Sequence, residues 1–284
     1  MSSAEVSVVI PTLGTSPYLR EAVESALAEQ PAEVIVVVNG GAEVDVPGAR
    51  LLRRDERGRS EARNLGVEQA RTPLVAFLDD DDRILPGRLA RQQGVLEQAW
   101  WAPLAFGRVR VVDGDERPRE DWNRLLDRRF AQLLRLGPVS YEDILAVQAP
   151  IYTSATMVRR DAFLAVGGFD AAFDAYEDLD LYLRLARVGE LAPVAGDPVT
   201  VYRLHGSNTP SPRLYDGALR VAEKHLPRTH GRAHRLLLER RLDALWGLGR
   251  YRDARRAAQR ALVEEPALLL HPRFAKRLLG TALR

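Results

Sequence analysis

Short and almost uniformly apolar runs recur along the first two thirds of the chain, each bounded by residues that favour turns. They cover residues 6–10, 34–38, 74–78, 104–112, 151–158 and 199–204, and a shorter run lies at 51–52. Apolar runs of this length between Gly, Pro, Asn or Asp residues are typical of buried strands. We therefore predict a strand at each of these positions.

The segments between the runs carry apolar residues at a helical period. We predict helices over residues 16–29, 58–69, 86–100, 120–136, 161–166 and 177–188. Ser16 and Pro17 supply a cap and a proline at the first helical position, which marks a helix start. Strands that alternate with helices at this spacing favour an α/β fold, with a mostly parallel sheet flanked by helices.

A break at residues 208–212, with sequence Asn-Thr-Pro-Ser-Pro, separates this pattern from a purely helical one. We place a domain boundary there, between an α/β domain over 1–212 and a small all-α extension over 213–284. Within the extension, a pattern similar to the second half of a tetratricopeptide unit contains Gly249, Tyr251, Ala254, Ala261 and Pro266. One copy is too short for a solenoid, so we expect a helical hairpin.

The composition limits the kinds of site and the cellular compartment that we expect for the protein. Cysteine is absent, so disulfides and thiolate metal sites are excluded. No apolar run approaches the roughly 18 residues of a membrane span, and the first residues lack a signal-peptide pattern. We expect a cytoplasmic protein.

Charge is distributed unevenly along the chain. Residues 213–284 carry 17 basic and 7 acidic side chains, or +10, whereas the first 212 residues carry 24 basic and 32 acidic ones, or −8. The bland interpretation of the basic extension is a solvated helical face. The sharper one is a face that meets an anionic surface, either the inner membrane leaflet, where the protein would be peripheral, or an acidic partner. We expect no nucleic-acid partner and leave a homodimer open.

Four consecutive carboxylates, Asp79 to Asp82, follow the apolar run 74–78. The carboxyl ends of strands are where open α/β sheets bind their ligands. Carboxylates this close repel one another unless a cation or hydrogen-bond donors offset the charge, and a hard divalent cation accepts such oxygen ligands. An acidic turn in solvent is the alternative, but such a turn does not need a buried strand leading to it.

Four motifs, taken together and in order, resemble family 2 glycosyltransferases with the GT-A fold, which transfer sugar from a nucleotide with inversion. They are Val8-Val9-Ile10-Pro11-Thr12, then Gly58-x-x-x-Ala62-Arg63-Asn64-x-Gly66, then Leu78-Asp79-Asp80-Asp81-Asp82 with Leu85-Pro86, and finally Gly167-Gly168-Phe169-Asp170 leading to Glu177-Asp178-Leu179-Asp180-Leu181 and Arg184. The resemblance covers about residues 5–207 and includes the family's DxD signature.

The resemblance implies roles for individual residues. Asp178 matches the catalytic base that deprotonates an acceptor hydroxyl, and Asp81 matches the ligand of Mg²⁺ or Mn²⁺ on the diphosphate of a nucleoside-diphosphate sugar donor. His205 matches a histidine near the metal in some members, with a hydrogen-bonded surface role as the alternative. The nucleotide-binding residues would be Pro11, Thr12, Asn39, Arg63, Asp79 and Asp80. Glu177 and Gly168 fall in the region of the acceptor and donor sugar, although Glu177 equally suits a helix N-terminus.

One position departs from the family pattern. The family's second strand usually ends in acidic or amide residues before Gly-Ser, and here Asn39 precedes Gly40 and Gly41. Asn39 can still pair with a base edge as donor and acceptor, but a carboxylate acceptor for uracil is missing there. The base, the sugar and the acceptor therefore stay open.

Two other function classes compete with a glycosyltransferase. A sugar-phosphate nucleotidyltransferase would need a Gly-rich loop and catalytic lysines, but both lysines of the chain, Lys224 and Lys276, lie in the extension. A non-catalytic nucleotide-sugar-binding scaffold would need neither Asp81 nor Asp178.

Overall fold

The computed structural model describes residues 3–148, 150–204, 212–266 and 268. Their contacts divide into two compact units. One holds the described residues up to Ala171 together with those from Leu181 to residue 204, and the other holds Ala172–Asp180 together with the described residues from 212 onward. Each unit is treated separately below.

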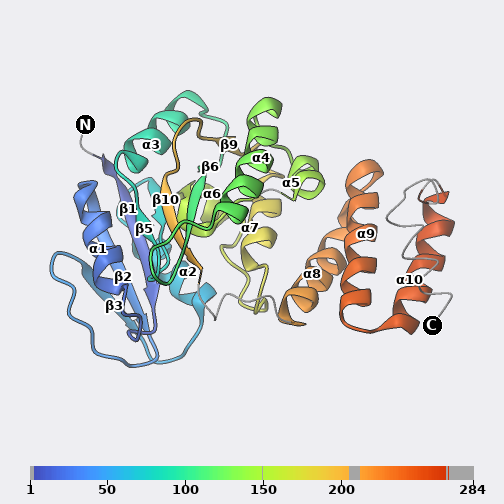
Figure 1. The fold of residues 1–284 in the computed structure, drawn as a ribbon, viewed down its shortest axis with the longest axis horizontal. Helices are drawn as coiled ribbons and strands as arrows, with labels where there is room; N and C mark the ends of the chain where they lie inside the picture. The colour runs from blue at the N-terminus through green and yellow to red at the C-terminus, as the bar shows by residue number, and fades with distance from the viewer. Residues whose placement is uncertain (1–2, 149, 205–211, 267, 269–284) are drawn as a thin grey trace. The chain divides into compact units, whose positions relative to one another are not determined.

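The first unit is built on a seven-stranded sheet of order β3-β2-β1-β4-β8-β6-β9, of which Figure 1 labels β1, β2, β3, β6 and β9. Its strands are β1 (Ser3–Thr12), β2 (Pro31–Asn39), β3 (Arg50–Arg54), β4 (Leu74–Phe77), β6 (Leu104–Phe106), β8 (Thr156–Arg159) and β9 (Ala192–Pro193). Only β8 runs antiparallel to its neighbours, β4 and β6; the other pairs are parallel. The mostly parallel α/β fold expected from the sequence is therefore confirmed.

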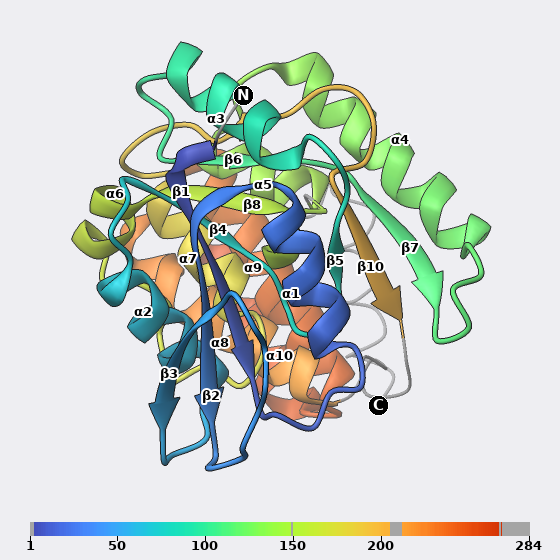
Figure 2. The ribbon, with the colours of Figure 1, turned by 90° about the vertical axis from the view of Figure 1, so that its left-hand side faces the viewer.

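A second, three-stranded sheet of order β5-β10-β7 stands beside it. It contains β5 (Arg83–Ile84), β7 (Val109–Asp113) and β10 (Thr200–Leu204), and Figure 2 shows β10 between the other two. The prediction of one strand over 104–112 was wrong, because Gly107 ends β6 and the chain enters a different sheet at Val109. A Cβ at Gly107 would lie 2.5 Å from Val199, so only glycine fits this crossing.

Helices cover both faces of the large sheet. The helices that contact its strands are α1 (Leu19–Ala28), α2 (Arg59–Gln69), α3 (Arg88–Gln98) and α6 (Arg160–Ala165). Helix α4 (Glu120–Leu136) packs on β7, α5 (Tyr141–Val147) packs on α4, and α7 (Glu177–Leu185) begins in the other unit. Figure 2 shows α1 beside β1 and β2, which it contacts. Side chains alternate along a strand, so Val8 and Ile10 pack in one layer with α1 and α3 while Val9 meets α2.

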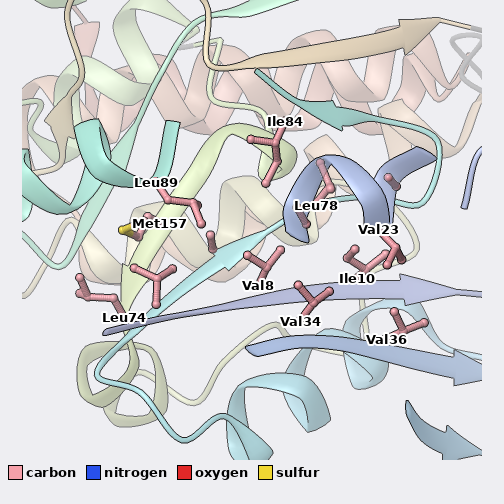
Figure 3. Packing of buried hydrophobic residues seen from close by; sticks show 14 of the residues in the cluster. Val8, Ile10, Val23, Val34, Val36, Leu74, Leu78, Ile84, Leu89 and Met157 are labelled. Carbon is pink, nitrogen blue, oxygen red and sulfur yellow. The ribbon is translucent and has the colours of Figure 1, made fainter. Parts of the chain in front are cut away.

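The main core lies between the sheet and the helices α1 and α3. Val8, Ile10, Val34 and Val36 are fully or almost fully buried, and Figure 3 shows them with Val23 of α1 and Leu89 of α3. The cluster continues to Leu78 and Ile84, on either side of the acidic turn. Burial of apolar surface therefore fixes the chain both before and after Asp79–Asp82.

The sequence did not reveal every element. The predicted strand over 151–158 begins as a single 3₁₀ turn at Thr153–Ala155 and becomes a strand only at Thr156. Helix α5 was not predicted; it begins with a capping box in which Ser140 and Asp143 bond each other's backbone N–H groups. The two-residue strands β5 and β9 also lack any sequence signal.

The second unit consists mainly of three helices, α8 (Pro212–His225), α9 (Gly231–Gly247) and α10 (Tyr251–Glu264), drawn in orange to red in Figure 1. Leucine and alanine side chains from all three form one buried cluster. Gly249, with φ of +70°, makes the turn between α9 and α10, a conformation that favours glycine. Within the described ranges, no helix is long and apolar enough to cross a membrane.

Candidate functional site

A pocket of about 620 Å³ lies at the carboxyl ends of β1, β2 and β4 in the first unit. Fourteen residues line it, and they include Pro11, Thr12, Asn39, Asp79, Asp80 and Asp81. The register explains this grouping, because β1 pairs in parallel with both β2 and β4 and all three strands end at the same edge. Six of the predicted site residues thus lie around one cavity.

Asp80 is tied to the end of β1. Its Oδ2 accepts a 2.5 Å hydrogen bond from the Thr12 hydroxyl, and its carbonyl accepts one of 2.9 Å from Ser16. Burial raises the pKa of the Asp80 carboxyl to about 6; the Thr12 hydrogen bond opposes this and the charges of Asp81 and Asp79 add to it. Asp80 therefore sits where additional positive charge would be favourable.

Asp79 is held from the opposite side by Arg63 of α2. The Arg63 guanidinium is buried and donates to Asp79 Oδ1, while the backbone N–H of Asp79 donates to Ser154 at 3.0 Å. Burial alone would raise the pKa of Asp79, but Arg63 and Arg59 together bring it below its usual value. Asp79 therefore stays ionised beside the pocket, with one face of its carboxylate already occupied.

Asp82 points away from the pocket into the protein and is only 1% exposed. Its Oδ1 accepts the backbone N–H of Arg203 at 2.9 Å, and its Oδ2 has no hydrogen-bond partner among the described residues. Burial, reinforced by the charges of Asp81 and Asp79, raises the pKa of Asp82 well above its usual value.

Arg203 on β10 is the principal support of the acidic turn, and sequence reasoning missed it. Its Nη1 donates to the carbonyl of Asp81 at 2.6 Å, and its guanidinium pairs with Glu21 and Glu116. The guanidinium also lies 3.8 Å from the centre of the Tyr18 ring, which lines the pocket. No pattern in the sequence could have joined β10 to a turn more than 100 residues earlier.

Arg88, fully buried on α3, supports the strand that leads to the turn. The ladder between β4 and β8 ends at Ala76, and Arg88 Nη2 then donates to the carbonyls of Phe77 at 3.0 Å and Thr156 at 2.9 Å. Burial lowers the pKa of the Arg88 guanidinium to about 9. The arginine replaces the missing ladder bonds where the sheet opens toward the pocket.

Asn39 uses its amide to join two walls of the pocket. Its Nδ2 donates to the Thr12 carbonyl and its Oδ1 accepts from the Gly58 N–H, both at 2.9 Å. The side chain is 3% exposed. Because both ends of the amide are engaged, contact with a nucleotide base through Asn39 stays a prediction.

The resemblance motif that contains Arg63 also has structural roles that the sequence did not reveal. Asn64 donates to the Phe169 carbonyl and accepts from the Phe169 N–H, each at 2.8 Å. Gly168 has φ of +65°, and a Cβ there would lie 2.6 Å from Asn64 Oδ1. Gly66 is similarly close to Val9. Gly168 does not line the pocket, and its conformation and packing account for glycine at this position.

The remaining predicted residues lie elsewhere. Glu177 and Asp178 open α7 in the second unit, where Glu177 is buried and Asp178 is half-buried with its Oδ1 accepting the Leu179 N–H at 2.7 Å. His205 lies outside the described residues.

The acidic turn has the ligand chemistry that Mg²⁺ or Mn²⁺ prefers. Asp79, Asp80 and Asp81 all face the pocket, and the pKa of Asp80 is raised by burial and by its neighbours. In the part of the chain that the structure describes, no three His, Asp, Glu or Cys side chains are arranged as a metal cage. A cation at the acidic turn would be held by one or two of its carboxylates together with substrate phosphates and water. The residues therefore fit such an ion.

Comparisons with known proteins place the chain in a family. The sequence model described as Glycosyl transferase family 2 matches residues 7–164, which is more than half of the chain. An uncharacterized glycosyltransferase of Bacillus subtilis, YwdF, is 30% identical over 193 residues, which are 64% of this chain and 68% of that protein. A pre-mycofactocin glycosyltransferase of Mycobacterium tuberculosis is 32% identical over 202 residues, which are 66% of this chain but only 40% of that protein.

Solved structures support the fold. The crystal structure of S. aureus TarS 1–349 in complex with UDP-GlcNAc aligns with a TM-score of 0.61 at 15% identity, over 98% of this chain and 80% of that one. The same protein in complex with UDP aligns with a TM-score of 0.60 over 85% of this chain and 70% of that one. The fold is thus that of a GT-A enzyme, and with the matched residues 7–164 the chain belongs to glycosyl transferase family 2.

Proposed function

We propose that the protein is a metal-dependent inverting glycosyltransferase that moves a sugar from a nucleoside-diphosphate sugar to an acceptor hydroxyl. The observation that carries the proposal is the pocket at the ends of β1, β2 and β4, where three consecutive aspartates face a cavity of about 620 Å³ in a family 2 chain. The acceptor stays open among glycans, lipid-linked sugars and natural products.

The pocket is proposed to take the nucleotide. Pro11, Thr12 and Asn39 form the wall at the ends of β1 and β2. Arg57, just before α2, and Arg59, its first residue, also line the pocket. Asp79, kept ionised by Arg63, is suited to accept hydrogen bonds from ribose hydroxyls. TarS, which has a similar fold, has been crystallised with UDP and with UDP-GlcNAc. This supports the proposal that the donor of the present protein is also a nucleoside-diphosphate sugar.

Asp81 is proposed to hold the cation, with Asp80 beside it. A divalent ion bound there would stabilise the negative charge that develops on the departing diphosphate. Other residues of the chain hold these two aspartates, since Arg203 donates a hydrogen bond to the Asp81 carbonyl and Thr12 donates one to the Asp80 carboxylate. These two bonds would fix the positions of the groups proposed to hold the ion.

Asp178 is proposed as the general base. Inversion requires in-line attack by the acceptor hydroxyl, and a single carboxylate that accepts its proton suffices. A second carboxylate acting as nucleophile, as in retaining hydrolases, is not required. Asp178 is half-buried in the structure.

Helix α10 is proposed to bring the protein to anionic lipid. Arg252, Arg255, Arg256 and Arg260 recur at helical spacing, all are exposed, and none forms an ion pair with another described residue. The exposed Val263 continues the same stripe. Arginines on one helix face are attracted to acidic headgroups, which would place the enzyme at the surface of a membrane.

A donor screen tests the proposed function. The full chain is incubated with Mn²⁺ and a panel of nucleoside-diphosphate sugars that includes UDP-GlcNAc, and release of nucleoside diphosphate is followed with and without EDTA. Slow, metal-dependent release with inverted configuration at the sugar carbon is expected for one donor. Binding of donors with no release from any of them would indicate a scaffold, and pyrophosphate release from a nucleoside triphosphate and a sugar phosphate would indicate a nucleotidyltransferase.

A further inference from the structure

The segment Ala172–Asp180, which carries Asp178, packs with the C-terminal helices in the second unit. Three contacts show that this segment packs closely against α8. Arg220 Nη1 donates to the Ala172 carbonyl at 3.0 Å, and Lys224 Nζ lies 5.1 Å from the centre of the Phe173 ring. Gly217 is so near Ala175 that a Cβ would lie 2.4 Å from the Ala175 carbonyl oxygen.

The strongest of these attachments is at Asp180, two residues after the proposed base. Asp180 is fully buried, and its Oδ1 lies 2.8 Å from Lys224 Nζ and 3.0 Å from His225 Nε2. His225 is itself buried, with 3% exposure. A buried carboxylate requires such partners, since an uncompensated charge in the interior is strongly unfavourable. The last turn of α8 is therefore anchored to the first turn of α7.

The backbone just before α7 is also constrained. Tyr176 has φ of +65°, a left-handed conformation that a tyrosine adopts only when its surroundings impose it. The Arg240 guanidinium of α9 lies 5.9 Å from the centre of the Tyr176 ring. Tyr176, just before Glu177, and Asp180, two residues after Asp178, thus both contact the C-terminal helices.

We propose that α8 is a positioning element for the reaction, in which Lys224 and His225 act through Asp180 to orient the carboxylate of Asp178. This inference rests on the proposed function of Asp178 as base. General-base catalysis depends on the carboxylate lying within hydrogen-bond reach of the acceptor hydroxyl, and a displacement of about 1 Å can lower the rate roughly 10²-fold. The helical extension is then part of the catalytic apparatus and not only a cap.

The test uses the full chain with Lys224→Met and His225→Leu, each of which removes one partner of Asp180 and keeps most of the side-chain volume. Each variant should lower kcat by about 10-fold to 10²-fold. The donor KM and the Mn²⁺-supported affinity for nucleoside diphosphate should stay unchanged. His225→Gln should recover most of the turnover, because its amide can still donate to Asp180. Glu223→Gln is the matched control; it removes a long, exposed pairing with Arg241 on α9 at 3.6 Å and leaves both partners of Asp180 in place, so kcat should stay unchanged.

A double-mutant cycle separates positioning from general loss of structure. In the Asp178→Asn background, His225→Leu should cause no further loss of turnover, because the group that it positions is already gone. Equal losses in both backgrounds, or a parallel fall in nucleotide affinity, would overturn the proposal. Unchanged kcat in both Lys224→Met and His225→Leu would also overturn it.

Hydrogen exchange supplies a readout that does not depend on turnover. In both variants, the amides of residues 176–181 should exchange at least about 10-fold faster, whereas those of residues 78–82 should keep the wild-type rate. Unchanged exchange at 176–181 would refute the anchoring whatever the enzyme does. A wild-type chain that turns over no donor would instead refute the proposed function, so the two failures are distinguishable.

Discussion

The two acidic clusters of the protein, Asp79–Asp82 and Glu177–Asp180, look alike in sequence but are supported in different ways. The first follows β4 and is held within its own unit by Arg63 of α2 and Arg203 of β10. The second opens α7 and is held by Lys224 and His225 of α8, in the helical unit.

The two clusters differ in which of their carboxylates pair with a cationic side chain. In the first cluster the arginines bond Asp79 and the backbone of the turn, and Asp80 remains with its pKa raised to about 6 by burial and neighbouring charge. In the second cluster the buried Asp180 takes the cationic partners. In the proposed function the first cluster receives a cation, whereas in the second the buried Asp180 pairs with Lys224 and His225 two residues after Asp178.

Among replacements at Asp178, Arg203, Gly66 and Arg256, that of the proposed base should have the largest effect. Asp178→Asn should lower turnover by about 10²–10⁴-fold, the range expected when general-base catalysis is removed. Donor affinity, measured by calorimetry with Mn²⁺, should be retained, because the residue is assigned to the acceptor. A collapse of donor affinity with turnover nearly intact would make Asp178 a nucleotide ligand.

Removal of the arginine behind the first cluster should come next. Arg203→Met should weaken Mn²⁺-supported nucleotide binding by about 10–100-fold, because groups that orient a metal ligand carry effects of this size. It should also lower the free energy of unfolding by about 2 kcal/mol through lost hydrogen bonds to charged groups.

Arg83→Met is the matched control for this prediction. Arg83 pairs with the same two carboxylates, Glu21 and Glu116, but is about one third exposed. The free energy of unfolding should change by less than about 1 kcal/mol, and nucleotide affinity should not change. Equal effects of Arg83→Met and Arg203→Met on affinity would mean that the turn does not depend on Arg203.

A smaller effect, on stability alone, is expected at Gly66, whose role in the Gly58–Gly66 motif is packing and not binding. Gly66→Ala places a Cβ 2.3 Å from Val9 on β1, so overpacking should reduce the free energy of unfolding by about 1–3 kcal/mol. Gly94→Ala on α3 meets nothing within 4 Å and should stabilise the helix by up to about 1 kcal/mol. Denaturant melts measure both, and a destabilisation by Gly94→Ala equal to that by Gly66→Ala would contradict the packing account.

The smallest effect is expected on α10. Arg256→Gln should reduce binding to phosphatidylserine vesicles by about 1 kcal/mol, or roughly fivefold, at low salt. Arg250→Gln, which removes an arginine already paired with Asp253, should change it less. Sedimentation across a salt series measures both, and equal binding to neutral and anionic vesicles would remove the proposed lipid surface.

Sequence reasoning located the fold and the positions of both clusters, because apolar runs and strand-end aspartates are local signals. The family resemblance grouped Thr12, Asn39 and Asp79–Asp81, and the structure brings them to one pocket because the parallel strands β1, β2 and β4 end at the same edge. The family resemblance, which the comparisons confirm, added Asp178 as a candidate.

The supports of the site could not be predicted, because they join residues far apart in the chain. Arg203 contacts a turn at Asp81, and His225 contacts Asp180 in a helix that the predicted domains kept separate. An arginine on a strand and a histidine in a basic helix carry no sequence signal for such partners. The split of residues 104–112 between two sheets was missed for the same reason, since it depends on Val199 crossing at Gly107.

The most direct test of the central claim is the binding of nucleoside diphosphate to Asp81→Asn with and without Mn²⁺. The account predicts that the wild-type chain binds UDP or another nucleoside diphosphate more tightly when Mn²⁺ is present, and that Asp81→Asn loses this enhancement, and turnover with it, while melting at the same temperature. Full Mn²⁺-enhanced binding and turnover in Asp81→Asn would contradict the assignment of the acidic turn as the metal and diphosphate site.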